Sequence, residues 1–235
     1  MISRETVPQK DGSLWQYYYI GNGVVVLTSM GRELIHDDPS ILTDIHRYRQ
    51  KRLGHTAALG SETVRSHFRS GGNSDVYELR EGSGLVVKET STAQAMYFAL
   101  LRMDRLKTII ESDVPRWIDI PAHYGLISSP SSTTDYMLME KIDAGITVGD
   151  VVDSSCEQVR ANQGTLATFG PIDEEVKQEV SDRFTRAKIL LDEAILSHDL
   201  LPVDYLPDWD ASNVLVERLE TPMAGSNYML WVIDQ

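Results

Sequence analysis

The sequence has a single cysteine, Cys156, among 235 residues, which excludes an internal disulfide bond. The six histidines are scattered and form no zinc-type ligand cluster with it. No apolar run approaches the roughly eighteen residues that cross a bilayer, and the first residues lead into polar sequence without a signal-peptide core. These absences favour a cytoplasmic protein with no membrane partner, in which Cys156 is a bystander thiol.

Basic residues are also scarce. The 22 lysines and arginines stand against 35 aspartates and glutamates, which gives a formal net charge of -13. Nucleic-acid binding draws its main affinity from lysine and arginine side chains that neutralise phosphates, so this balance argues against a nucleic-acid partner. Basic runs at residues 47–52 and 102–107 are interpreted as solvated helix faces. The length suffices to bury a sizeable core.

The most informative pattern that is present lies near the end of the sequence. Asp208 is followed five residues later by Asn213 at the edge of an apolar strand, and Asp234 follows a second apolar strand. Phosphoryl transfer from ATP needs a carboxylate to orient the acceptor hydroxyl, and an amide and a second carboxylate to hold magnesium. Aspartate-rich turns between strands are common, so this pattern does not decide the function by itself.

A glycine-rich turn and a lysine at the end of a strand stand upstream. The turn and the strand that leaves it contribute Gly71, Gly72, Asn73, Ser74 and Val76. A tight hairpin then delivers a third strand, which ends in Lys88. Glycines let a backbone approach phosphates closely, and lysine supplies a point charge for phosphate oxygens. The competing interpretation is an ordinary glycine-turned hairpin with a solvated lysine.

A third motif is the apolar strand at residues 136–140, which runs into a polar connector that ends at Gly145. In this order, the motifs resemble the protein-kinase-like superfamily, especially its atypical branch of aminoglycoside phosphotransferases and minimal kinases. The resemblance spans roughly residues 63–234. It implies an α+β, bilobal fold with an antiparallel β small lobe (63–139), a hinge (140–145) and a reduced, mainly helical large lobe (146–235).

The same resemblance implies a nucleotide site between the lobes, with ATP and magnesium as cofactors. Lys88 would contact the α- and β-phosphates, and Met139 would lie behind the adenine as the gatekeeper. Backbone groups of Glu140 and Ile142 would hydrogen-bond the adenine. The family pairs its strand lysine with a glutamate on the following helix. That helix, expected from about residue 93 to 110, has no such glutamate, and Asp104 is the best substitute.

For the chemistry, the resemblance implies that Asp208 is the catalytic base and that Asn213 and Asp234 bind magnesium. The sequence also departs from the family. Leu206 and Pro207 replace the residues that usually brace the catalytic loop, Asp210 stands where a basic residue usually faces the transferred phosphate, and Gln235 follows the metal-binding aspartate. We therefore expect a kinase that phosphorylates a hydroxyl of a protein or small molecule, with a catalytically weak pseudokinase or nucleotide-binding interaction module as the alternative.

Residues 1–62 lie outside these motifs and form an N-terminal extension. Apolar runs on both sides of Asn22-Gly23 predict a β-hairpin over residues 15–28. Asp38-Pro39-Ser40 predicts the start of a helix that ends near residue 53. The extension either packs on the small lobe or binds a protein partner. Further along, acidic residues at 173–175 predict the start of a long helix that reaches His198.

Overall fold

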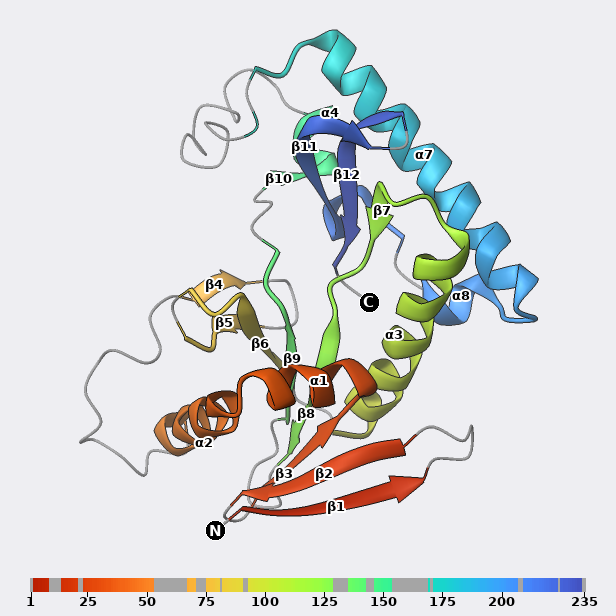
Figure 1. Ribbon diagram of the computed structural model, residues 1–235. Coiled ribbons are helices and arrows are strands. Elements are labelled where there is room, and N and C mark those ends of the chain that lie inside the picture. Colours follow the sequence, from red (N-terminus) through yellow and green to blue (C-terminus); the bar gives the residue numbers. More distant parts are fainter. Residues whose placement is uncertain are drawn as a thin grey trace. The chain divides into compact units, whose positions relative to one another are not determined.

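The computed structural model describes residues 2–8, 14–20, 23–52, 67–70, 75–80, 82–90, 93–128, 135–142, 146–153, 169, 171–206, 209–223 and 225–233. The chain divides into two compact units, one of Met1–Asp104 with Ala122–Lys141 and one of Arg105–Pro121 with Ile142–Gln235. Each unit has its own sheet and helices, so the fold is mixed α+β (Figure 1). The division after Lys141 falls inside the expected hinge, and the N-terminal extension belongs to the first unit.

An eight-stranded antiparallel sheet forms the first unit. Its strands, in spatial order, are β1 (Ile2–Pro8), β2 (Leu14–Ile20), β3 (Gly23–Leu27), β8 (His123–Ser128), β9 (Asp135–Glu140), β6 (Leu85–Thr90), β5 (Asp75–Glu78) and β4 (His67–Ser70). The β2–β3 hairpin confirms the Asn-Gly signal. Val26 of β3 pairs with Leu126 of β8, which makes the extension part of the same sheet.

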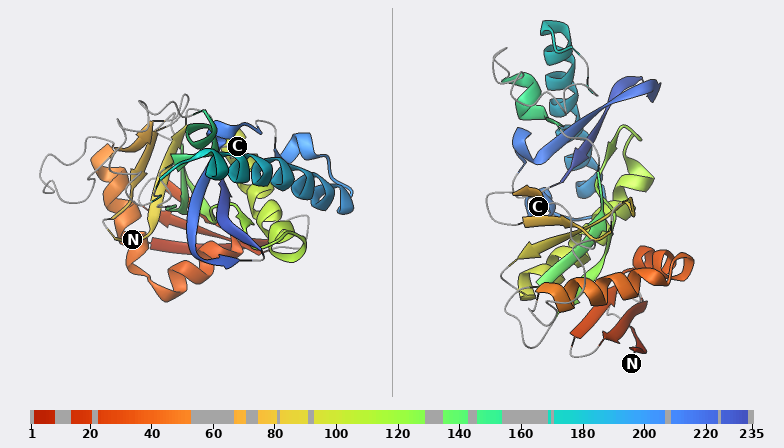
Figure 2. Two further views of the ribbon diagram at one scale, coloured as in Figure 1. Left: turned by 90° about the horizontal axis from the view of Figure 1, so that it is seen from above. Right: turned by 90° about the vertical axis from the view of Figure 1, so that its left-hand side faces the viewer.

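Helices α1 (Ser29–Asp37) and α2 (Ser40–Arg52) cover one face of this sheet. Their apolar residues Ile35, Ile45 and Tyr48 share a buried cluster with Val87 and Leu138 of the sheet. The two helices and the strands can be followed in Figure 2. The sequence signal at Asp38-Pro39-Ser40 therefore marks the start of α2, as predicted, whereas α1 and β1 were not predicted.

Helix α1 begins directly on the backbone of β8. The hydroxyl of Thr28 accepts the N–H of Gly31 at 3.1 Å and donates to the carbonyl of His123 at 2.9 Å. A Cβ atom at position 31 would lie only 1.9 Å from the carbonyl oxygen of Tyr124. Gly31 is therefore required because no side chain fits where the helix meets the strand.

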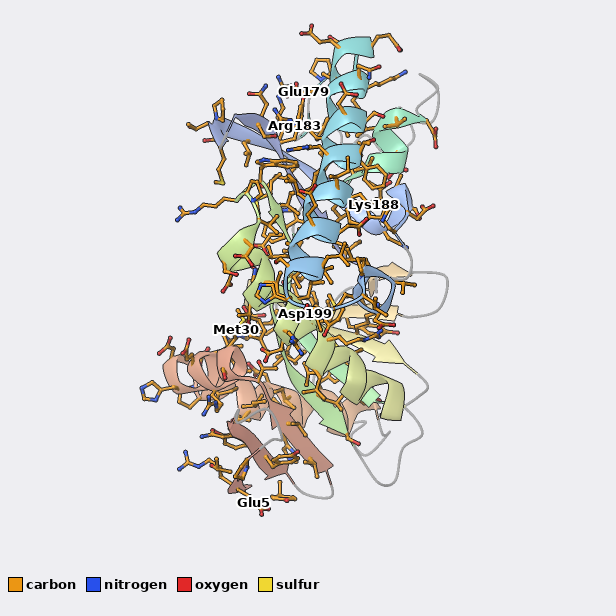
Figure 3. The ribbon with its side chains drawn as sticks, turned by 90° about the vertical axis from the view of Figure 1, so that its right-hand side faces the viewer. Glu5, Met30, Glu179, Arg183, Lys188 and Asp199 are labelled. Atoms are coloured by element: carbon orange, nitrogen blue, oxygen red, sulfur yellow. The ribbon has the colours of Figure 1, made fainter. Side chains whose placement is uncertain are left out.

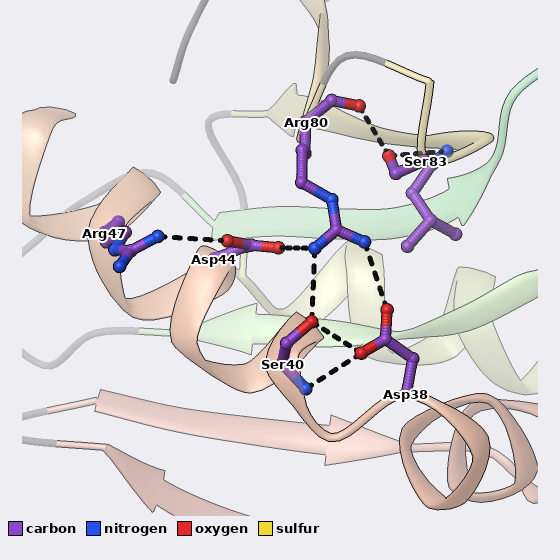
Figure 4. Close-up of polar contacts among 7 residues, drawn as sticks. Asp38, Ser40, Asp44, Arg47, Arg80 and Ser83 are labelled. Atoms are coloured by element: carbon purple, nitrogen blue, oxygen red, sulfur yellow. Dashed lines mark hydrogen bonds and ion pairs between the residues drawn. The ribbon is translucent and has the colours of Figure 1, made fainter. Parts of the chain in front are cut away.

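An ion-pair cluster around Arg80 joins the α1–α2 corner to the turn that follows β5 (Figure 4). Its guanidinium contacts the carboxylates of Asp38 and Asp44, each at 3.0 Å, and donates to the hydroxyl of Ser40 at 3.1 Å. The hydroxyl of Ser40, followed by Arg80, lowers the pKa of Asp38. Asp44 is only 5% exposed and has a second, longer contact with Arg47 at 3.6 Å. Arg80 thus fixes the helical layer to the sheet through side chains far apart in sequence.

The opposite face of the sheet packs against helix α3 (Ala93–Asp113). Leu100 of α3 belongs to a buried cluster with Val86, Met137 and Met139. Met103, Leu106 and Ile110 are also buried, which confirms the helical spacing expected for this segment. The division between the two units falls within this helix, after Asp104.

The second unit contains a four-stranded sheet in the order β10 (Ile146–Thr147), β11 (Val214–Met223), β12 (Ser226–Val232) and β7 (Ile118–Asp119). Strands β11 and β12 confirm the two apolar strands expected near the end of the sequence. They pair antiparallel, with Val214 opposite Val232. Strand β7 runs parallel to β12. Strands β7 and β8 are close in sequence but belong to different sheets.

Helix α7 (Glu174–Ser197) is the long helix of the second unit, accompanied by α4 (Val148–Val152) and α8 (Pro202–Tyr205). Asp173 caps α7 by accepting the N–H of Val176 at 2.9 Å, and Glu174 and Glu175 complete an acidic first turn. Such residues offset the positive end of the helix dipole. The boundaries expected from the sequence are therefore confirmed, with His198 as the C-cap. No helix in the described part of the chain is both long and apolar enough to cross a membrane.

Candidate functional site

Lys88 lies on β6, between the two strands that carry the other nucleotide-site candidates. It is directly opposite Val76 of β5 and Met137 of β9. Residues directly opposite in antiparallel strands share one face of the sheet. Since Met137 packs in the cluster that contains Leu100, this is the face toward α3. Lys88 is thus a half-buried lysine on an otherwise apolar face.

The glycine-rich turn at Gly71, Gly72, Asn73 and Ser74 lies outside the described residues. The strands on both sides of it are described, and Ser70 of β4 pairs with Asp75 of β5. Val76, the next residue along β5, is the one opposite Lys88. The strand that leaves the turn therefore brings its first residues alongside the lysine.

The expected hinge begins where β9 ends. Met139 is buried, as a residue behind a ligand would be. The N–H of Glu140 donates to the carbonyl of Ala122 at 2.8 Å, and its carboxylate accepts the N–H of Ala122 at 3.0 Å. Lys141 donates its N–H to Gly84 at 2.8 Å. In an antiparallel pair, the backbone groups of successive residues point alternately toward and away from the neighbouring strand. Because the N–H of Lys141 points toward β6, the backbone carbonyl of Glu140 points away from β6 and is not bonded to that strand.

Asp104 and Ile142 are the other two candidates for this region. Asp104 is half-buried on α3, one helical turn after Leu100, which packs on the face that carries Lys88. Residues four apart lie on the same side of a helix. The pairing of Lys88 with Asp104 stays a prediction. Ile142 is buried and is the first residue of the second segment of the second unit.

In the second unit, Asn213 ends the short helix η1 (Ala211–Asn213) just before β11. The backbone carbonyl of Asn213 accepts the N–H of Ile233 at 3.0 Å. This bond aligns the residue before β11 with the residue after β12. Asp234, the next residue along the chain, lies outside the described residues. The carbonyl of Asp210 accepts the N–H of Asn213 at 3.0 Å.

Asp210 has a local structural role that the sequence did not suggest. Its carboxylate accepts the N–H of Ser212 at 2.8 Å, which caps η1. This backbone bond, together with the Ser212 hydroxyl, lowers the pKa of Asp210. The carboxylate therefore stays ionised at neutral pH and holds the turn that carries Asn213.

Asp208 and Pro207 lie outside the described residues, but the residues around them are described. Leu206 is buried. The ring of Trp209 stacks on Phe184 of α7, with centroids 5.0 Å apart, and the Nζ of Lys188 lies 5.9 Å from the Trp209 centroid. Sequence reasoning did not identify this support. The feature of the sequence that could have indicated it is the pair Phe184 and Lys188, which lie four residues apart and so on one face of the helix.

His198, expected to be a helix cap, also joins the ends of two helices. Its Nε2 lies 2.6 Å from the carboxylate of Asp113, the last residue of α3. This contact lowers the pKa of Asp113. The contact accounts for His198 without catalytic chemistry.

Within the described part of the chain, no three His, Cys, Asp or Glu residues gather closely enough to hold a metal ion. One of the two residues expected to bind magnesium, Asp234, is outside that part. No known protein-family model matches the chain, and no curated protein sequence matches it significantly.

Proposed function

We propose that this protein is an ATP- and magnesium-dependent kinase that transfers the γ-phosphoryl group to a hydroxyl of a protein or small-molecule acceptor. The observation that carries the proposal is the position of Lys88. It lies on the strand between β5, which follows the glycine-rich turn, and β9, which runs into the expected hinge. Lys88 is also half-buried on an apolar face, unlike a solvated lysine in an ordinary hairpin.

The first unit supports a small lobe of the kind that the resemblance implies. Strands β4, β5, β6, β9 and β8 are adjacent and antiparallel, and α3 packs on the face that carries Lys88. In this proposal Lys88 pairs with phosphate oxygens and Val76 packs against the nucleotide. The carbonyl of Glu140, which faces away from β6, would accept a hydrogen bond from the adenine amino group.

The second unit supports the chemical step. Carboxylate and amide oxygens are suitable magnesium ligands. The backbone bond between Asn213 and Ile233 places Ile233, the residue before Asp234, alongside Asn213. Magnesium, when bound, would neutralise charge on the phosphates. Asp208 would accept the hydrogen bond of the acceptor hydroxyl and orient it for attack. The stacking of Trp209 on Phe184 would hold the loop that carries Asp208.

One observation favours the alternative of a weak or inactive relative. Asp210 stands where a basic residue would face the transferred phosphate, and its carboxylate is used to cap η1. A negative charge there would not stabilise charge that develops in the transition state. A nucleotide-binding module without transfer activity would retain the contacts of Lys88 and lose only the chemistry.

Magnesium-dependent ATP binding, measured by calorimetry, tests the nucleotide site. Lys88→Ala should weaken binding by roughly tenfold or more, because it removes a charge-assisted contact to phosphate. Lys177→Ala is the matched control, since this lysine pairs with Glu174 on the surface of α7. Equal affinity of the wild type and the Lys88→Ala variant would refute the site.

Transfer is tested separately from binding, with labelled γ-phosphate and a panel of protein and small-molecule hydroxyl acceptors. Transfer to an acceptor supports the kinase. Binding of ATP without transfer to water, to the protein itself or to any acceptor would replace the kinase by the nucleotide-binding module.

A further inference from the structure

An open groove of about 730 Å³ lies in the second unit, beside the first turns of α7. The helix side of the groove carries the carboxylates of Asp173, Glu175 and Glu179, and the β11–β12 hairpin adds Glu220. Glu179 accepts a hydrogen bond from the amide of Asn227 at 3.2 Å, which places it next to the hairpin (Figure 3). The groove is therefore strongly acidic.

Local structure explains only part of this charge. Asp173 caps α7 and Glu175 lies in its first turn, where the helix dipole favours acidic residues. Glu179 is beyond the first turn and Glu220 is on a strand, so neither gains from the dipole. The cation that lines the groove, Arg218, reaches the carbonyl of Phe169 at 3.5 Å. Four carboxylates beside one guanidinium leave the groove with a net negative charge, which attracts a further cation.

The phenol of Tyr228 is a second feature of the groove, independent of its charge. Tyr228 is 2% exposed, lines the groove, and stacks on Phe169 with ring centroids 5.8 Å apart. The backbone N–H and carbonyl of Tyr228 both hydrogen-bond to the hydroxyl of Ser226. Its phenol has no hydrogen-bond partner among the described residues. Burial, followed by the charge of Glu179, raises the pKa of Tyr228, so the phenol stays neutral. The phenol oxygen is not one of the fully buried polar atoms that lack a hydrogen-bond partner, so it is open to the groove, where a donor could bind it.

The arrangement of the groove favours an extended organic cation over a metal ion. Its carboxylates are not gathered into a metal-binding group within the described chain. They suit ammonium or guanidinium groups spaced along a chain, which donate to carboxylates and to a phenol oxygen. Apolar lining residues, Val176, Leu219 and Pro222, can pack against the aliphatic stems of such groups.

The strand beside the groove favours a peptide over a free polyamine. Consecutive residues of β11, Arg218, Leu219 and Glu220, all line the groove. Neighbouring strand residues point to opposite faces, so the groove follows the strand edge. Among the described strands, β10 pairs with β11 only at Leu215 and Val216, and the register with β12 shifts between Arg218 and Met223. Among the described residues, the edge of β11 away from β12 has no strand partner along this stretch, so an added strand could pair there.

We propose that this groove docks an extended basic segment of a partner protein, with its lysine or arginine side chains on the carboxylates and on Tyr228. The site is distinct from the proposed nucleotide contacts and does not rest on them. Its test can therefore be made without nucleotide.

The test is fluorescence anisotropy with a labelled peptide of alternating arginine and valine, and spermidine as the competitor. The wild type should bind the peptide, and Glu179→Lys and Glu220→Lys should each weaken binding by about tenfold, because each replaces an attraction by a repulsion. Tyr228→Phe should weaken it severalfold, since only the hydroxyl is lost. Glu193→Lys is the matched control, because this exposed glutamate of α7 is outside the groove.

Circular dichroism verifies that each variant is folded, and Glu220→Lys, on an exposed strand position, serves if Glu179→Lys does not fold. Loss of binding in the groove variants with unchanged binding in Glu193→Lys supports the proposal. Equal loss in Glu193→Lys would reduce the binding to general charge attraction. Displacement of the peptide by spermidine at an equal concentration would assign the groove to free polyamines. Absence of peptide binding by the wild type would refute the proposed docking site.

Discussion

Replacing Arg80 by alanine tests whether the ion-pair cluster holds the α1–α2 layer to the sheet. Among the described residues, the variant leaves the carboxylate of Asp44 with only the longer contact to Arg47, at 3.6 Å. Removing one partner of a fully buried pair costs about 3–5 kcal/mol, whereas an exposed pair contributes about 0–1 kcal/mol. Asp44 is 5% exposed and Arg80 is 41% exposed. We therefore expect Arg80→Ala to lower the free energy of unfolding by about 2 kcal/mol, between these limits.

Urea denaturation followed by tryptophan fluorescence and circular dichroism measures this change. Arg47→Ala is the matched control, because Arg47 is 52% exposed and contacts the same carboxylate at a longer distance. It should cost less than about 0.5 kcal/mol. In an Asp44→Asn background, the cost of Arg80→Ala should fall below about 1 kcal/mol, because no buried charge is then left without its partner.

Two results would contradict this account of the cluster. One is an equal loss of stability in Arg80→Ala and Arg47→Ala. The other is a cost of Arg80→Ala that is undiminished in the Asp44→Asn background. Either would show that the buried carboxylate does not depend on Arg80.

Three other predictions follow from the site and its surroundings. Asp208→Asn should retain ATP affinity and lose phosphoryl transfer by roughly a hundredfold, as positioned acid-base groups do; parallel loss of affinity in calorimetry would contradict its role. Removing residues 233–235 deletes the N–H that Asn213 accepts, together with Asp234. The truncated protein should therefore lose the magnesium-dependent rise in melting temperature that ATP binding gives, and a full rise would exclude Asp234 as a ligand. In the folded protein the pKa of Asp38 is lowered below its ordinary value of 3.8. The ionised carboxylate therefore stabilises the fold at pH values above 3.8, and this contribution is lost as the pH falls through the lowered pKa. Asp38→Asn should be less stable than the wild type at neutral pH, with the difference disappearing in acid; a difference that persists in strong acid would refute this linkage.

Local signals in the sequence predicted most of the individual elements. The Asn-Gly pair predicted the β2–β3 hairpin, and the acidic first turn predicted the start of α7. The two apolar runs near the end of the sequence predicted the strands β11 and β12. In each case the residues that decide the conformation lie within a few positions of each other.

What could not be predicted depends on contacts between distant residues. The pairing of Val26 with Leu126 joins segments a hundred positions apart, and no local pattern specifies it. The start of α1 depends on Gly31 fitting against Tyr124, which is equally remote. The parallel pairing of β7 with β12 was missed because a strand of two residues has no readable period.

The candidate site divides in the same way. The tight hairpin predicted that β5 and β6 are antiparallel neighbours, and Val76 lies opposite Lys88. The pairing of Lys88 with Met137 of β9 was not predicted. The support beneath the loop that carries Asp208 required Phe184 to meet Trp209 across 25 positions of sequence, and was not foreseen. Residue types can thus suggest the reacting groups, while the side chains that hold them emerge only from the fold.

The N-terminal extension has a different meaning once its pairing is known. Without residues 1–52, β8 would lose its neighbour β3, and Ile127, Val87 and Leu138 would lose the helices that cover them. These three side chains are fully buried in the intact protein. An extension that supplies three strands at one end of a sheet and one wall of its core cannot detach to bind a partner without exposing that core. Any partner of the extension must therefore bind its outer surface, formed by the edge strand β1 and the solvent-facing sides of α1 and α2.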